Sequence, residues 1–212
     1  MFNTEVNRNF FVKEGFLVLK GYYNITKEIQ DAATILMQDT AYKNGRRFMT
    51  DNVAEIPEGL RNLVYNDEIS NFFNFLEAKI PCQNAMITYD YLNKFEINQY
   101  LHFDRWKSLK AMVYLTDVEE GDGAFSVAPG SHIRGGELRR LNKNLPYTMR
   151  PNRVEHDFPE DYKKPVKILG PSGTLILFDS DIFHCGGNVS EGHSRKLIRT
   201  HWYYNRKWAE IV

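Results

Sequence analysis

The sequence is poor in the features that mark secreted and membrane proteins. It contains only two cysteines in 212 residues, Cys82 and Cys185. Two cysteines cannot build a disulfide framework, so we expect reduced thiols and a fold held by its hydrophobic core. No apolar run approaches the ~20 residues that a membrane-spanning helix needs. The N-terminal segment also lacks a basic stretch followed by an apolar core. These absences predict a soluble cytoplasmic protein.

The chain also lacks an excess of either charge, since 27 basic residues balance 27 acidic ones. It therefore has no overall basic field of the kind that accompanies nucleic-acid binding, and we expect no nucleic-acid or membrane partner. Aromatic residues are plentiful at 14%. They favour strands and line small-molecule pockets, so the expected partner is a small molecule. Nothing in the sequence predicts an oligomeric state.

The length predicts one domain, residues 1–212, with a helical support region over residues 1–80. A short apolar strand is expected at 16–19. A helix should follow Thr26, which can cap it. A second amphipathic helix is expected over residues 67–79, ended by Pro81. Arg46, Arg47 and Phe48 fall between the two helices, in a predicted loop.

Residues 81–212 change to strand-like patterns and form the predicted core. Segments rich in β-branched and aromatic residues, bounded by turn residues, cover 85–92, 96–104, 109–118, 123–132, 165–170, 173–180 and 196–205. Helices followed by many short strands predict an α+β, mainly β fold with a sandwich or barrel core. Residues 134–164 are polar and rich in proline without a clear period, which is typical of a lid or insertion.

Three residues in the strand-rich region form a candidate metal site. His102 and Asp104 lie two apart, so they share a face if the segment is extended. His184 follows the apolar strand 174–178. Two histidines and one carboxylate make the facial triad that leaves open positions on iron(II). In the alternative interpretation, His102 and Asp104 simply hydrogen-bond each other.

A candidate partner for a dicarboxylate lies eleven residues after His184. Arg195 opens the last predicted strand, and its planar guanidinium matches a carboxylate. The alternative is an exposed charge at the start of a strand. Arg199 is a rival because it shares the strand face of Arg195. His201 continues that face and could also meet the cavity.

The motifs together resemble the phytanoyl-CoA dioxygenase-like family of Fe(II)/2-oxoglutarate-dependent oxygenases. The similarity lies in EGFLVLKG, HFD, LTDVEEGDGAFSVAPGSH and FHCGGNVSEGHSRKLIRTHW. It implies a double-stranded β-helix, or jelly roll, whose helices support one sheet. It also implies that His102, Asp104 and His184 bind iron.

The same resemblance implies co-substrate contacts. Arg195, at its spacing from His184, would bind the distal carboxylate of 2-oxoglutarate in preference to Arg199. Gln83 or Asn84 would supply a polar co-substrate contact. Gly186 departs from relatives that carry Ser or Thr there.

The substrate pocket is harder to assign from sequence. Tyr100 shares the expected face of His102 and Asp104, and Trp106 continues that alternation. Phe48 follows the Arg46–Arg47 pair, which is either a contact for an anionic substrate or a solvated pair. For each aromatic residue the alternative is ordinary core packing. His132, in the PGSH segment, is interpreted as structural.

The implied reaction needs Fe(II), 2-oxoglutarate and O2, and releases succinate and CO2 as a C–H bond is hydroxylated. Halogenases of similar fold replace the carboxylate ligand with a small residue, so Asp104 favours hydroxylation. Desaturation and cyclisation use the same cofactors and stay open. Two alternatives from other classes are an oxygenase that modifies a protein side chain or nucleobase, and a non-catalytic β-helix binding module.

Overall fold

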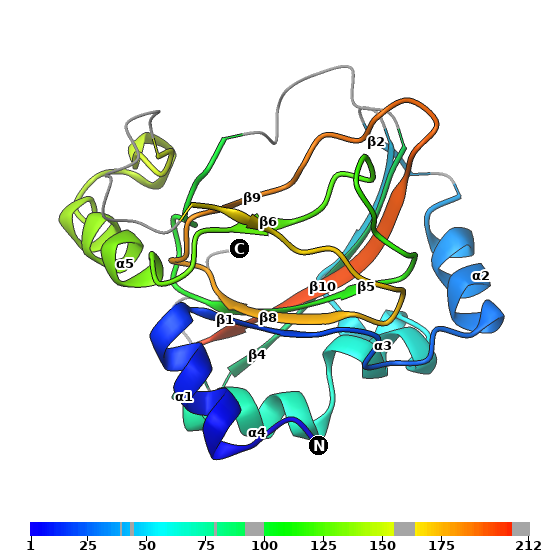
Figure 1. Cartoon of the computed structure of the whole chain (residues 1–212), viewed down its shortest axis with the longest axis horizontal. Coiled ribbons are helices and arrows are strands. Elements are labelled where there is room, and N and C mark those ends of the chain that lie inside the picture. Colours follow the sequence, from blue (N-terminus) through cyan, green and yellow to red (C-terminus); the bar gives the residue numbers. More distant parts are fainter. Residues whose placement is uncertain (39, 43–44, 79, 92–99, 155–163, 205–212) are drawn as a thin grey trace.

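The computed structural model describes residues 1–38, 40–42, 45–78, 80–91, 100–154 and 164–204. Within them, two sheets lie face to face, and helices cover the outer face of the larger sheet (Figure 1). The larger sheet has seven strands in the order β1-β8-β5-β10-β4-β3-β2, and the smaller has three in the order β7-β6-β9. All pairings are antiparallel. The chain is therefore a double-stranded β-helix with supporting helices, which confirms the predicted fold class.

The element bounds show how the chain alternates between layers. The larger sheet contains β1 (Phe16–Leu19), β2 (Ala41–Tyr42), β3 (Gly45–Thr50), β4 (Ile80–Asp90), β5 (Leu109–Tyr114), β8 (Leu175–Asp179) and β10 (Arg195–Tyr203). The smaller sheet contains β6 (Ser126–Val127), β7 (Val166–Lys167) and β9 (His184–Cys185). The helices are α1 (Glu5–Glu14), α2 (Lys27–Leu36), α3 (Glu58–Val64), α4 (Asp67–Phe75) and α5 (His132–Leu141), with 3-10 turns η1 (Val53–Glu55) and η2 (Tyr147–Met149).

The two predicted N-terminal helices are present, with one boundary changed. Thr26 caps α2 by accepting a hydrogen bond from the Ile29 amide. Asn66 caps α4, and α4 ends at Phe75, four residues before the predicted end. Pro81 lies within β4 rather than at the end of the helix. No described helix has the length and apolar character that crossing a bilayer would require.

Several elements were not predicted, and the predicted loop around Arg47 is wrong. These residues form β3, which pairs with β4 in the register Arg47↔Thr88 and Phe48↔Ile87. The strand mixes basic and apolar residues because its two faces meet different surroundings. Helices α1 and α3 were also missed.

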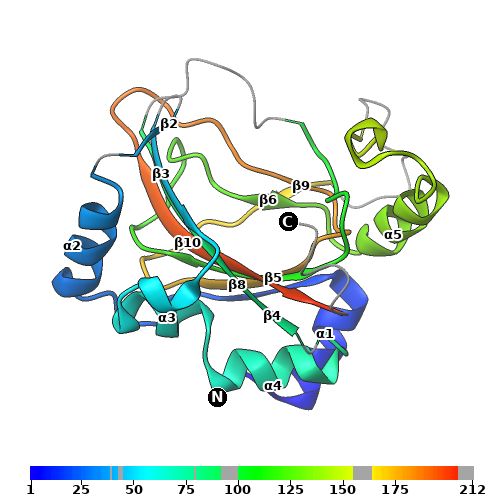
Figure 2. The ribbon, with the colours of Figure 1, turned by 180° about the vertical axis from the view of Figure 1, so that it is seen from behind.

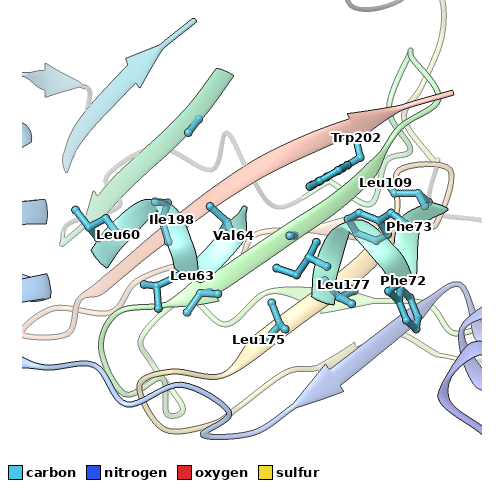
Figure 3. Close-up of a cluster of buried hydrophobic side chains, with 14 of the residues drawn as sticks. Leu60, Leu63, Val64, Phe72, Phe73, Leu109, Leu175, Leu177, Ile198 and Trp202 are labelled. Carbon is cyan, nitrogen blue, oxygen red and sulfur yellow. The ribbon is translucent and has the colours of Figure 1, made fainter. Parts of the chain in front are cut away.

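Apolar side chains join the helices to the outer face of the larger sheet (Figure 3). Phe73 of α4 meets Trp202 edge-on with ring centroids 5.6 Å apart, and Tyr65 stacks on Trp202 at 5.5 Å. The view from behind shows α3 and α4 below the same sheet (Figure 2). Leu60, Leu63, Val64, Phe72, Leu109, Leu175, Leu177 and Ile198 complete this packing. Burial of apolar surface stabilises the fold by about 25 cal/mol per Å2, and it is the main force that holds the helices against the sheet.

The inner face of the larger sheet is apolar at one end. There Tyr114 donates a hydrogen bond from its hydroxyl to the Ile168 carbonyl at 3.0 Å and accepts one from the Phe125 amide at 3.1 Å. Phe125 packs on Phe178 at 4.8 Å. Strand alternation turns Arg195, Leu197, Arg199 and His201 of β10 toward the same interior. The interior thus changes from apolar packing to polar residues along β10.

The predicted insertion at 134–164 has regular structure at its start. Helix α5 covers its first residues, although Gly135 and Gly136 weaken a helical pattern. A Cβ on Gly135 would lie 1.8 Å from the Asp181 carbonyl oxygen, so glycine is needed for this close packing. Residues 155–163 lie outside the described residues. The strand predicted over 96–104 also falls partly outside them, and 100–104 contributes only isolated bridges at His102.

Candidate active site

His102 and Asp104 are positioned by backbone pairing with the segment that carries His184. The His102 amide donates to the His184 carbonyl at 3.0 Å, and the His184 amide donates to the His102 carbonyl at 2.8 Å. The Asp104 amide donates to the Ser180 carbonyl at 2.8 Å. Phe103, between them, points away and packs in a cluster with Phe183. His102 and Asp104 therefore face the same side, as the alternation predicted.

The three side chains converge on one point. One ligand atom from each of His102, Asp104 and His184 lies within 4.8 Å of the others. His184 Nε2 is 3.7 Å from Asp104 Oδ1. Two ligands at right angles on a metal, with bonds of about 2.1 Å, lie roughly 3 Å apart. His184 and Asp104 would therefore have to move closer together to bind the same metal ion. Two imidazoles and one carboxylate fit iron(II).

Carbonyl oxygens orient both imidazoles. His184 Nδ1 lies 2.7 Å from the Ile182 carbonyl, and His102 Nδ1 lies 3.0 Å from the Tyr100 carbonyl. A carbonyl can only accept, so each Nδ1 carries the hydrogen and each Nε2 keeps its lone pair for a metal. Burial lowers the pKa of His184 to about 3, and burial also lowers the pKa of His102. Both rings are therefore neutral near pH 7.

Asp104 has a buried cationic partner that sequence reasoning missed. Lys110 of β5 is 3% exposed and pairs with Asp104 Oδ2. Burial alone would raise the pKa of Asp104, but the charges of Lys110, His184 and His102 together hold it below its usual range. Among the described residues, Asp104 bonds to Lys110 rather than to His102. The signal in the sequence was a single lysine inside the apolar run LKAMVY.

Arg195 lies in a smaller cavity next to the triad. It is 6% exposed, which contradicts the alternative of an exposed strand-start charge. Its Nη2 donates to Asp90 Oδ2 at 2.9 Å, its Nη1 donates to the Gly123 carbonyl, and its Nε is buried without a partner. The cavity measures about 210 Å3 and also includes His102, Asp104, His184 and Gly186. A dicarboxylate that reaches from the triad to Arg195 fits this space and charge.

A larger cavity of about 510 Å3 shares His102 and Asp104 with the smaller one. Trp106 lines it, as predicted, and stacks on Tyr147 with ring centroids 5.0 Å apart. Asn84 lines this larger cavity and is not among the lining of the smaller one, and its predicted co-substrate contact stays a prediction. His201 lines the larger cavity as well. Gln83 lies in β4, but its side chain is outside the described residues.

Two residues predicted to contact the substrate, Phe48 and Tyr100, are not among the lining of either cavity. Phe48 packs against the helix-covered core, because its place opposite Ile87 turns it to the outer face of the sheet. Its neighbour Met49 lines the larger cavity instead. Tyr100 is 42% exposed and lies under the guanidinium of Arg153 at 4.5 Å. Its predicted orientation needed a strand that continues before His102.

Other cavity residues came from segments that sequence reasoning left unassigned. Tyr147 and Asn152 belong to the predicted insertion, and Arg105 follows the triad carboxylate. His132 has a structural contact, with Nε2 3.1 Å from the Val12 carbonyl. That contact agrees with its interpretation from sequence.

A double-stranded β-helix that brings two imidazoles and a carboxylate to one point is typical of non-haem Fe(II) oxygenases. The family model for phytanoyl-CoA dioxygenase matches residues 98–197, which include the triad and Arg195. Over these residues the chain is similar to the phytanoyl-CoA dioxygenase family, and it is a 2-oxoglutarate-dependent non-haem iron oxygenase with Fe(II), 2-oxoglutarate and O2 as its cofactor and co-substrates.

Solved structures share the fold. The carbocyclase SnoK from nogalamycin biosynthesis is 18% identical over 94% of this chain and 83% of that chain, with a TM-score of 0.66. EctD from S. alaskensis is 16% identical over 94% and 76%, with a TM-score of 0.65. HygX from Streptomyces hygroscopicus, with nickel, 2-oxoglutarate and hygromycin B bound, is 15% identical over 94% and 87%, with a TM-score of 0.58. No curated protein matched the sequence significantly.

Proposed function

We propose that the chain hydroxylates a C–H bond of a small-molecule substrate, with His102, Asp104 and His184 as the iron ligands and Arg195 as the partner of the distal 2-oxoglutarate carboxylate. The observation that carries the proposal is the convergence of the three ligand atoms within 4.8 Å, where two adjoining cavities meet. One cavity suits the co-substrate, and the other suits the substrate.

Several residues of this chain orient the three proposed metal ligands. Lys110 holds one oxygen of Asp104, which leaves the other oxygen on the side of His184. The carbonyls of Ile182 and Tyr100 hold the two rings in the metal-binding tautomer. When bound, the iron, 2-oxoglutarate and O2 supply the oxidation, with release of succinate and CO2. The protein orients the substrate and excludes water from the site.

The size of the larger cavity favours a small molecule over a macromolecule. Its volume of about 510 Å3 is within the range typical of small-molecule sites. A modifier of proteins or nucleic acids would need a long open groove beside the metal. SnoN in complex with nogalamycin RO and EctD with 5-hydroxyectoine are structurally similar proteins that hold small molecules. The presence of Asp104 favours hydroxylation over halogenation.

The test combines binding and turnover. Anaerobic addition of Fe(II) and 2-oxoglutarate should give a weak visible charge-transfer band, and a compound screen should find substrate-dependent succinate formation. Asp104→Ala should abolish succinate formation and weaken the band, because it removes a metal ligand. Asp31→Ala is the matched control, since Asp31 lies on the exposed side of α2, where it pairs with Lys27. A wild-type protein that forms no band with Fe(II) and 2-oxoglutarate would refute the proposal.

A further inference from the structure

Arg199 lies at the boundary between the two cavities. It is in the middle of β10, opposite Met86 of β4 and Met112 of β5. Its side chain lines the larger cavity and also the smaller one. Arg195, four residues earlier on the same face, lines only the smaller cavity. Arg199 is thus the arginine of β10 that a substrate in the larger cavity can reach.

The guanidinium of Arg199 has little to bond with in the protein. Its Nε is buried without a hydrogen-bond partner, and its Nη2 makes one weak contact, 3.7 Å from the thioether sulfur of Met86. Within the described part of the chain it forms no ion pair, whereas Arg195 pairs with Asp90. A buried cation without an anionic partner is costly. An anion that enters the cavity would supply this partner.

Positive charge also dominates the two cavities as a whole. Their described lining includes the basic residues Arg47, Arg105, Lys110, Arg195 and Arg199, against the acids Asp90 and Asp104. Iron(II) adds two positive charges, and 2-oxoglutarate brings two negative ones. Bound iron and 2-oxoglutarate therefore leave the excess of positive charge unchanged. This charge favours a further anion in addition to 2-oxoglutarate.

We propose that Arg199 is a specificity residue that binds a carboxylate of the substrate in the larger cavity. This inference rests on the proposed function, in which the metal and Arg195 occupy the two carboxylates of 2-oxoglutarate. Arg105 also lines the larger cavity, but its Nε already donates to the Arg150 carbonyl, so Arg199 is the arginine of that cavity whose Nε lacks a partner and which can take a substrate carboxylate. Trp106, Tyr147 and Met49 give the same cavity apolar walls, so the substrate is an acid with an apolar or aromatic body.

The test measures binding, so it does not depend on turnover. The probes are hexanoate, phenylacetate and N-acetyl-leucine, each compared with its primary amide, in the presence of Ni(II) and saturating 2-oxoglutarate. Calorimetry gives the Kd of each probe and, separately, of 2-oxoglutarate. Wild type should bind at least one acid about ten-fold more tightly than its amide, the range of a charge-assisted hydrogen bond.

Two variants separate charge from packing. Arg199→Met matches the neighbouring Met86 and Met112 and should abolish the preference for the acid. Arg199→Lys keeps the positive charge and should retain part of the preference for the acid. The melting temperature of the apoprotein should not fall in Arg199→Met, because a poorly paired buried cation is removed. The Kd for 2-oxoglutarate should change by less than about two-fold, far below the effect of a lost charged hydrogen bond. Arg134→Met, on the exposed side of α5, is the control.

Three results would overturn the inference. The first is equal Kd values in wild type for every acid and its amide. The preference could survive in Arg199→Met, which would assign it to another residue. Arg199→Met could weaken 2-oxoglutarate by the same factor as the acid, which would place Arg199 in the co-substrate site. Failure of wild type to bind 2-oxoglutarate at all would instead refute the proposed function.

Discussion

Lys110 and Asp104 form a buried ion pair in which the two oxygens of the carboxylate face different partners. Oδ2 meets the Lys110 ammonium, while Oδ1 lies 3.7 Å from His184 Nε2. Lys110 thereby fixes which oxygen is available on the histidine side. A carboxylate held in this way is preorganised to bind a metal through one oxygen.

Replacing Lys110 should weaken metal binding. In Lys110→Met, Asp104 loses the partner that orients it, and loss of such a supporting contact typically weakens metal affinity by about 10- to 100-fold. Titration with Ni(II) measures the effect. Lys196→Met is the control, because Lys196 lies on the opposite face of the sheet and bonds to Thr34. Equal Ni(II) affinity in Lys110→Met and wild type would contradict the prediction.

Replacing Arg195 should weaken co-substrate binding without loss of the metal. Arg195→Gln removes the cation from the smaller cavity, and a hydrogen bond to a charged group is worth about 1.5–3 kcal/mol, or roughly 10- to 100-fold in Kd. Anaerobic calorimetry with 2-oxoglutarate tests this. Ni(II) affinity measured without 2-oxoglutarate should stay at the wild-type value. The prediction is wrong if both affinities fall together.

The apoprotein should lose stability as the pH falls from about 6.5 toward 3. An unfolded histidine takes up a proton below about pH 6.5, whereas burial holds the pKa of His184 at about 3. The unfolded state therefore binds more protons in this window, and acid favours unfolding. The contribution of His184 between pH 6.5 and 5 is about 2 kcal/mol.

Thermal denaturation at a series of pH values checks this dependence. His184→Gln should show a shallower loss, though not a flat one, because burial also lowers the pKa of His102 and of His201. A parallel loss in wild type and His184→Gln would count against the assignment.

The packing of α5 on the segment before His184 should tolerate a methyl group at one glycine and not at its neighbour. A Cβ on Gly135 would lie 1.8 Å from the backbone oxygen of Asp181, whereas one on Gly136 would lie 3.0 Å from an oxygen of the Asp181 side chain, a much milder overlap. Gly135→Ala should destabilise the protein by roughly 1–3 kcal/mol or more. Gly136→Ala should cost less. Urea denaturation gives the free energy of unfolding of both variants. Equal values for Gly135→Ala and Gly136→Ala would refute the packing argument.

Local sequence patterns were enough for the ends of several elements. Thr26 and the strand at Phe16–Leu19 were predicted correctly, because a capping hydroxyl and a short apolar run act on their immediate neighbours. The misplaced Phe48 shows the limit. Its orientation depends on the register between β3 and β4, and that pairing joins residues about forty positions apart in the sequence.

The sequence by itself determined the donor set. His102 and Asp104 share a side because alternation is a property of extended backbone, His184 was proposed as the third ligand from its place after an apolar strand, and the resemblance to the family favoured Arg195 over Arg199. Only the tertiary structure decided what surrounds these residues. Lys110 reaches Asp104, and Arg199 stands between two cavities, because β5 and β10 pair side by side. Such pairing is set by burial of the whole sheet face, which no local pattern encodes.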